Sequence, residues 1–240
     1  MFKINFHLTV YRYEAITALI ILLLTGSIAV SSRDDGHLSL PSLRYSYKVA
    51  LTFDDGPHPR YTDRIISILQ QQQVQATFFV VGSQVILHPD LVARLSDHGQ
   101  ELAVHSFTHR NLTHLSDTEI KNELLSTRRL LQDITRQNVG FFRPPGGQYD
   151  QRVLEVTGRL GLPMVLWTVI PRDHEENNPN AIVERVLAQV DDNGVILLHS
   201  GRDATLEALP RIIHELRMRG YRFVTITQLY RSASRDQFAW

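Results

Sequence analysis

Thr52-Phe53-Asp54-Asp55-Gly56 follows an apolar run, and His105-Ser106-Phe107-Thr108-His109 follows another about fifty residues later. Two adjacent carboxylates and two histidines at a spacing of four therefore lie where two predicted strands end. One carboxylate and two imidazoles make a three-ligand site for a divalent metal and leave one position for water. We assign Asp55 and the two histidines to the metal, so Asp54 is available as a general base on that water. The pattern predicts a metal-dependent hydrolase.

Each half of this pattern has a simpler interpretation. Asp-Gly-Pro at 55–57 is ordinary turn chemistry. His105 and His109 taken alone read as surface or core histidines, of which the chain has eleven. A turn does not need two carboxylates, however, and placing two together is costly without a cation. The combination of both halves favours the metal site.

The amino-acid composition excludes several classes of function. The 240 residues suit one domain with a sizeable core, and 25 Lys and Arg balance 25 Asp and Glu. No basic field therefore indicates nucleic acid as a partner. The chain has no cysteine, which excludes a disulfide framework, a thiolate nucleophile and a cysteine-ligated zinc site. Any metal must be held by histidine and carboxylate.

The N-terminal segment differs from the rest of the chain. Residues 15–30 are almost uninterruptedly apolar, and Lys3 and Arg12 precede them. The run is slightly short for a helix that spans a bilayer and slightly long for the core of a signal peptide. A cleaved signal and an uncleaved membrane anchor both stay open, and either one exports the chain to the cell envelope or beyond. We divide the chain into this leader (1–31), a linker (32–46), a globular domain (47–230) and a C-terminal tail (231–240).

Short apolar runs alternate with amphipathic ones in the globular domain. The apolar runs lack a strict polar alternation, which is typical of parallel strands buried on both faces. Strands are expected at 48–53, 76–81, 101–105, 141–142, 164–168, 195–199 and 222–226, and helices at 62–73, 89–97, 116–137, 150–160, 180–190 and 205–219. Ser116 and Glu119 form a capping box at the third of these helices. The alternation predicts an α/β fold with a parallel sheet, closed or partly closed as a barrel.

Further polar residues follow the other predicted strands, and parallel barrels carry their chemistry at the carboxyl ends of the strands. Arg143 opens the segment Arg143-Pro144-Pro145-Gly146-Gly147. We interpret it as the partner that keeps Asp54 ionised, with backbone N–H groups nearby for an oxyanion. His199 alone reads as a core histidine, but at this edge it is a candidate general acid for a leaving amine. Asp173 is expected to hold His199 and raise its pKa.

These motifs resemble those of the polysaccharide deacetylases, the nodulation-type deacetylases of carbohydrate esterase family 4. The resemblance covers roughly residues 47–230. It rests on Thr-Phe-Asp-Asp-Gly at 52–56, His-Ser-x-x-His at 105–109, Arg-x-Pro at 143–145, Leu-x-His at 197–199 and a similar second strand at 76–82. It implies a distorted (β/α)7 barrel that removes N-acetyl groups, usually from polymers of N-acetylglucosamine.

The resemblance also implies roles for individual residues. The catalytic positions are the base Asp54, its orienting residue Arg143, the general acid His199 and the carboxylate Asp173 that tunes it. The metal ligands are Asp55, His105 and His109, and the metal is usually zinc. The substrate pocket is implied at Pro145, Gly146, Trp167 and Leu197, with Leu197 as a wall of the acetyl pocket.

Two departures from the family pattern bear on specificity. Gly146 stands where many members have an aromatic residue. Ile170 and His174 replace the first Asp and the Trp of an Asp-x-x-Asp-Trp segment, whose second Asp is retained as Asp173. We expect the reaction to survive, because the oxyanion donor is a backbone N–H. The side chains that line the sugar groove differ, so the choice of sugar stays open.

We therefore interpret the chain as an exported, metal-dependent N-deacetylase of an N-acetylated polysaccharide such as peptidoglycan or a chitin-like glycan. One alternative is the same chemistry on an O-acetyl ester or a non-sugar amide, since esters and amides share one tetrahedral pathway. A second is a catalytically silent glycan-binding domain, although all seven polar positions are present. The leader would add the membrane as a partner if it stays uncleaved. The glycan, the metal used in vivo and the oligomeric state are left open by the sequence.

Overall fold

The computed structural model describes residues 47–236. The predicted leader and linker, residues 1–46, lie outside the described residues, as do residues 237–240. Among residues 47–236, no helix is both long enough and apolar enough to cross a lipid bilayer.

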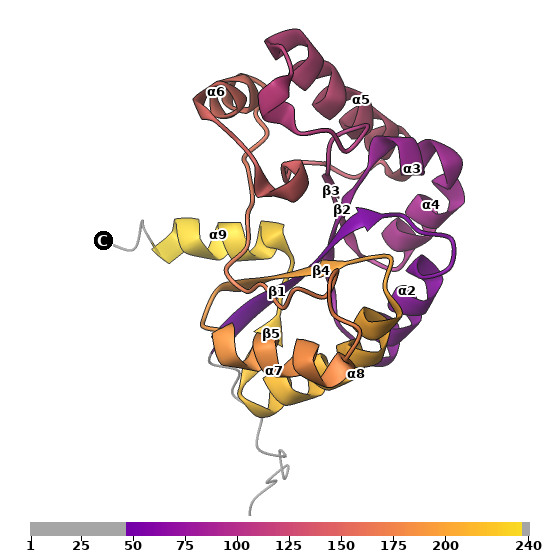
Figure 1. Ribbon diagram of the computed structural model, residues 1–240, viewed down its shortest axis with the longest axis vertical. Helices are drawn as coiled ribbons and strands as arrows, with labels where there is room; N and C mark the ends of the chain where they lie inside the picture. Colours follow the sequence, from indigo (N-terminus) through magenta and orange to yellow (C-terminus); the bar gives the residue numbers. More distant parts are fainter. Residues whose placement is uncertain (1–46, 237–240) are drawn as a thin grey trace, which may run out of the picture. The chain divides into compact units, whose positions relative to one another are not determined.

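A parallel sheet built around β1 (Tyr47–Gly56) forms the centre of the fold (Figure 1). β1 pairs with β2 (Thr77–Val80), and β2 pairs in turn with β3 (Glu101–Val104). β4 (Gly194–His199) pairs with residues 49–54 of β1, and β5 (Tyr221–Phe223) pairs with residues 47–49. All four pairings are parallel, as the continuous apolar runs predict.

Isolated bridges continue the ring between β3 and β4. They join Val104 to Phe142, Phe142 to Met164, and Val169 to Ile196. The α/β fold with a distorted barrel is therefore confirmed. The prediction of full strands at 141–142 and 164–168 is wrong, because the two segments contribute only isolated bridges, two through Phe142 and one through Met164.

Arg143 explains why these two segments do not become strands. Its Nε donates to the carbonyl of Val165 at 3.1 Å, and its Nη2 donates to the carbonyl of Leu166 at 3.1 Å. Carbonyls that accept from a guanidinium are diverted from the hydrogen-bond ladder of a sheet. Pro144 and Pro145 then follow Arg143 and have no N–H to donate. The segment that begins at Arg143 thus interrupts the strand pairing of the barrel.

Helices connect and cover the strands. Six of them match predicted helices within a few residues: α2 (Thr62–Gln71), α4 (Pro89–Asp97), α5 (Asp117–Thr135), α6 (Gln151–Arg159), α7 (Pro179–Gln189) and α8 (Asp203–Met218). The capping box of Ser116 and Glu119 at the start of α5 is confirmed. Two helices were not predicted, the short α3 (Gly82–Leu87) and the C-terminal α9 (Ile226–Asp236).

α9 begins where the sequence predicts the end of the last strand. The N–H of Ile226 donates to Thr77 Oγ1 at 3.0 Å, and the N–H of Thr227 donates to Glu101 Oε1 at 3.1 Å. Side chains of β2 and β3 therefore satisfy the free N–H groups of the first turn. In Figure 1, α9 lies across the sheet from α2, α3 and α4.

The two faces of the strands have different neighbours, because side chains alternate along a strand. Val49, Leu51 and Phe53 of β1 belong to the large core. Ala50 of β1 belongs to a smaller inner cluster with Phe79, Ala103, Phe141, Val195 and Ile226. By the same alternation, Asp54 lies on the face of Ala50, and His199 lies on the face of Val195. The side chains of Asp54 and His199, at the ends of their strands, therefore point to the inner side of the ring.

Candidate active site

The carboxyl end of β1 places its two carboxylates differently. Asp54 is 3% exposed and pairs in register with His199 of β4. Asp55 is more exposed and has a φ of 69°. Ser106 and His109 also have positive φ, at 61° and 59°. Non-glycine residues in the left-handed region are uncommon and cluster at functional sites. Three of them meet at this point.

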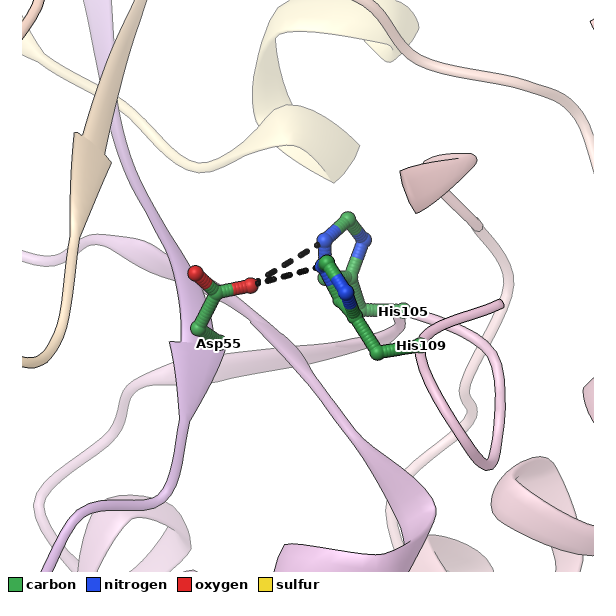
Figure 2. A group of neighbouring side chains, drawn as sticks. All are labelled: Asp55, His105 and His109. Atoms are coloured by element: carbon green, nitrogen blue, oxygen red, sulfur yellow. Dashed lines mark ion pairs between the residues drawn. The ribbon is translucent and has the colours of Figure 1, made fainter. Parts of the chain in front are cut away.

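The three predicted metal ligands converge. Asp55 Oδ1 lies 3.1 Å from His109 Nε2 and 3.4 Å from His105 Nε2. Figure 2 shows the carboxylate facing both imidazole rings across a small gap. One donor atom from each residue lies within 4.8 Å of the other two. A strand end and one loop thus bring together three side chains that could hold a single ion.

The tautomer of His105 and the charge of Asp55 are the ones that metal binding requires. His105 Nδ1 lies 2.9 Å from the carbonyl oxygen of Arg143. Because a carbonyl only accepts, the ring proton is on Nδ1 and the lone pair of Nε2 faces Asp55. Burial would raise the pKa of Asp55, but hydrogen bonds from the two imidazoles, which form when the rings carry a proton on Nε2, outweigh burial and lower that pKa well below its usual range. An ionised carboxylate and an imidazole held in the right tautomer are the state that a divalent ion requires.

Helix α5 holds the loop that carries the two histidines. Glu123 is buried and accepts hydrogen bonds from the N–H groups of Phe107 and Thr108, at 2.7 and 2.8 Å, and from Thr108 Oγ1 at 2.6 Å. Thr127 Oγ1 donates to the carbonyl of Ser106 at 2.8 Å. Glu123 is a supporting residue that was not predicted from the sequence. Its signal was a carboxylate on the buried stripe of α5, between Ile120 and Thr127.

We expect Glu123→Gln to lower the free energy of unfolding at neutral pH by about 1–3 kcal/mol, because a neutral amide accepts these bonds less strongly. Burial would raise the pKa of Glu123, but hydrogen bonds from Thr108 and Phe107 outweigh it and lower the pKa from 4.5. The stabilisation is therefore present above pH 4.5 and is lost as the pH falls through the lowered folded-state value.

Urea unfolding at several pH values tests this expectation. Glu155→Gln, on an exposed position of α6, is the control. The difference between wild type and Glu123→Gln should shrink in acid, whereas the control should differ little at any pH. A difference for Glu123→Gln that is independent of pH would contradict the assigned role.

Arg143 and Asp54 form a buried ion pair. Arg143 Nη1 donates to Asp54 Oδ1 at 2.6 Å and to Thr52 Oγ1 at 2.9 Å, and the Arg143 side chain is 0% exposed. Its guanidinium lies over the ring of Phe79, 4.0 Å from the centroid. Burial lowers the pKa of Arg143, and the charge of Asp54 opposes that shift. Asp54 Oδ2 lies on the side of His105, 3.8 Å from its Nε2. One oxygen of Asp54 is thus held by Arg143, and the other faces His105, one of the predicted metal ligands.

A second tethered pair stands across the sheet edge. His199 Nδ1 and the His199 N–H each lie 2.8 Å from an oxygen of Asp173, and Thr205 Oγ1 donates to Asp173 at 2.6 Å. Burial lowers the pKa of His199, but the hydrogen bond and the charge of Asp173 outweigh it, so the net pKa is raised. The direction is the one that the sequence suggests. Thr205, which was not predicted from the sequence, also holds Asp173 in place.

Of the predicted pocket residues, Trp167 lies beside the ion pair, with its ring centroid 5.5 Å from Arg143 Cζ. Gly147 has a φ of 69°, and a Cβ there would lie 2.6 Å from a ring atom of Trp167, so only glycine allows this packing. A Cβ at Gly146 would meet nothing within 4 Å. Pro145 is buried, and Leu197 lies on β4 two residues before His199, on the same face of the strand. The position where many family members carry an aromatic side chain is therefore open here.

The segment around Asp173 also departs from the family pattern. Ile170 is 42% exposed. The ring of His174 lies against that of His199, with 4.9 Å between the centroids. His174 Nε2 lies 3.1 Å from Glu175 Oε1. A second imidazole therefore stands beside the candidate general acid.

Comparisons with known proteins agree with this geometry. Residues 46–165 match the model of a family described as polysaccharide deacetylase. A peptidoglycan-N-acetylglucosamine deacetylase of Listeria monocytogenes is 36% identical over 191 residues, which cover 80% of this chain and 40% of the relative. The chain thus spans less than half the length of that relative.

Two solved structures have a TM-score of 0.74 to this fold. One is a peptidoglycan deacetylase from Bacillus subtilis, 34% identical, with 80% of this chain and 93% of that chain covered. The other is a pseudoenzyme of carbohydrate esterase family 4 from Bacillus anthracis, 31% identical, with 78% and 66% covered. Family match, sequence identity and shared fold agree, and the chain belongs to the polysaccharide deacetylase family.

Proposed function

We propose that this chain is a metal-dependent hydrolase that removes N-acetyl groups from an N-acetylated polysaccharide, a polymer of N-acetylglucosamine such as peptidoglycan or a chitin-like glycan. The observation that carries the proposal is one constellation at one sheet edge. It consists of a three-donor metal group, a carboxylate tethered to a buried arginine, and a histidine tethered to a buried aspartate. The relatives from Listeria and Bacillus are described as peptidoglycan deacetylases, which supports the choice of substrate.

Asp55, His105 and His109 would hold the metal, and we propose zinc. Two imidazoles and one carboxylate are a common zinc donor set in hydrolases, and they leave a position open. A bound divalent ion supplies Lewis-acid polarisation of the acetyl carbonyl and lowers the pKa of a bound water.

The protein's own residues then move the protons. Asp54 accepts the proton of the attacking water, because the ion pair with Arg143 fixes Oδ1 and leaves Oδ2 on the side of His105. His199 donates a proton to the departing amine from its Nε2, because Asp173 holds the Nδ1 side of the ring. The tethered groups lose little freedom as the reaction proceeds, since both are already fixed.

Backbone and pocket complete the site. Pro144 and Pro145 have no N–H, so the first backbone N–H after Arg143 belongs to Gly146, and we assign it to the developing oxyanion. Leu197 and Trp167 enclose the acetyl methyl group. The open space at Gly146 widens the groove where many family members are aromatic.

We further propose that the chain acts outside the cytoplasm. The apolar run at residues 15–30 supports export as a cleaved signal or as an anchor in the membrane. The Listeria relative is named for peptidoglycan, which is a cell-wall polymer. A fusion of residues 1–46 to a reporter enzyme that works only after export would test the leader.

Acetate release is the direct test of the activity. The screen covers peptidoglycan, chitooligosaccharides, a poly-N-acetylglucosamine and acetylated xylan, each with added zinc and with a chelator. We expect free acetate and free amine from an N-acetylated glycan, loss of both with the chelator, and recovery when zinc is restored. Release from acetylated xylan alone would assign the chain to O-acetyl esters, and release from none would favour a silent glycan-binding domain. The pseudoenzyme from Bacillus anthracis shows that this fold also occurs without activity.

A further inference from the structure

A second group of metal-binding side chains lies beside the proposed general acid. One donor atom each from Asp173, His174 and His199 lies within 4.8 Å of the other two. We propose that this group is a second, weaker site for a divalent cation, and that an ion bound there inhibits the enzyme by engaging His199. The inhibitory part rests on the proposed function, whereas the binding part does not.

Asp173 and His199 already place an oxygen and a nitrogen donor close together. Asp173 Oδ1 and His199 Nδ1 are 2.8 Å apart, and Asp173 is 1% exposed. A nitrogen and an oxygen bound to one tetrahedral zinc ion at about 2.0–2.2 Å each lie about 3.4 Å apart. The ion would therefore be admitted if the two donors separate by about half an ångström, if Asp173 Oδ1 moves off the line of the hydrogen bond, and if His199 gives up its Nδ1 proton.

His174 makes the group accessible and supplies the third donor. Its side chain is 45% exposed, whereas the side chain of His199 is 17% exposed. Glu175 Oε1 lies 3.1 Å from His174 Nε2 and can orient the ring, as carboxylates orient metal-bound histidines elsewhere. An ion can thus reach Asp173 and His199 from solvent past His174.

The two sites have the same kinds of donor atoms, but only the first has its histidine lone pair already free for an ion. Each offers two imidazoles and one carboxylate, so the same borderline metals, zinc and copper above all, suit both. At the first site, the lone pair of His105 Nε2 already faces Asp55, because Nδ1 bonds the carbonyl of Arg143. At the second site, an ion must displace the proton between His199 and Asp173. The second site should therefore fill only at higher metal concentration.

Occupation of the second site would stop the proposed acid catalysis. Asp173 would lose its hydrogen bond from His199, and the ring would carry an ion in place of the proton that favours donation from Nε2. The chain would then lose activity in excess metal, although its first site stays filled.

Equilibrium dialysis against zinc tests the binding. We expect wild type to bind two zinc ions per chain in two steps. His174→Phe, which keeps a ring against His199, should lower the affinity of the weaker step at least about tenfold. His174→Asn gives the same test without the ring. His109→Ala should weaken the tight step and leave the weaker one. His214→Phe, an exposed histidine of α8 outside both groups, should match wild type. An unchanged weaker step in His174→Phe and His174→Asn would overturn the proposal.

Acetate release over the same zinc range tests the inhibition. Each variant is scaled to its own maximum. The activity of wild type and of His214→Phe should fall as the weaker step fills, and that of His174→Phe should hold at those concentrations. Equal inhibition of wild type and His174→Phe would overturn the inhibitory role. Absence of acetate from every glycan would count against the proposed function instead, while dialysis still decides whether the second site exists.

Discussion

Asp54→Asn is expected to retain the metal and to lose on the order of 10²–10⁴-fold in kcat, the usual contribution of a general base. The asparagine keeps an oxygen for Arg143 Nη1 but accepts no proton from water at neutral pH. It also leaves the fully buried guanidinium without its counter-charge, so we expect a lower melting temperature. Turnover and zinc binding are measured at a temperature where the variant is folded.

Asp55→Asn is the matched comparison, since it makes the same chemical change one residue along. It removes the anionic oxygen that lies 3.1 and 3.4 Å from the two imidazoles. We expect it to lose both zinc and turnover, because an amide oxygen is a poor ligand for zinc beside two imidazoles. Equal loss of zinc in the two variants would mean that the neighbouring carboxylates are misassigned.

The sequence predicted the sheet edge because its signals are local. Apolar runs mark the strands, and a polar residue at the end of a parallel strand lies at the same edge as the others. Asp54, His105 and His199 could therefore be placed together without coordinates. The alternation of side chains along a strand also predicts which face of β1 carries Asp54, since Ala50, Thr52 and Asp54 are two residues apart and share one face.

Other features depend on contacts between distant segments, and local patterns do not encode these. Glu123 supports a loop 15 residues earlier in the chain, yet on its helix it reads as a lone carboxylate. The start of α9 depends on Glu101, 126 residues away. The failed strand at 164–168 has its cause in the Arg143 side chain, which takes the carbonyls of Val165 and Leu166. In each case the conformation of one segment's backbone depends on a polar side chain from another segment.

His199→Ala is expected to damage N-deacetylation far more than the cleavage of an aryl acetate. An amine leaves a tetrahedral intermediate poorly unless it is protonated, whereas an aryl oxide leaves without help. The loss for the amide should be on the order of 10²–10⁴-fold. Both substrates are measured at a zinc concentration that fills the tight site only. Equal losses on both substrates would remove His199 from acid catalysis and leave it as a packing residue at the end of β4.

Asp173→Asn tests the same assignment through pH. The acid must be protonated to act, so the rate for the amide falls as the pH rises through the pKa of His199. Asp173 raises that pKa against the effect of burial. Removal of the carboxylate charge should therefore lower the pKa of His199 and move the basic limb of the pH–rate profile to lower pH. The aryl acetate should show little of this shift, because its leaving group needs no proton. A basic limb that stays in place for the amide would mean that Asp173 supports the fold of this edge and does not tune His199.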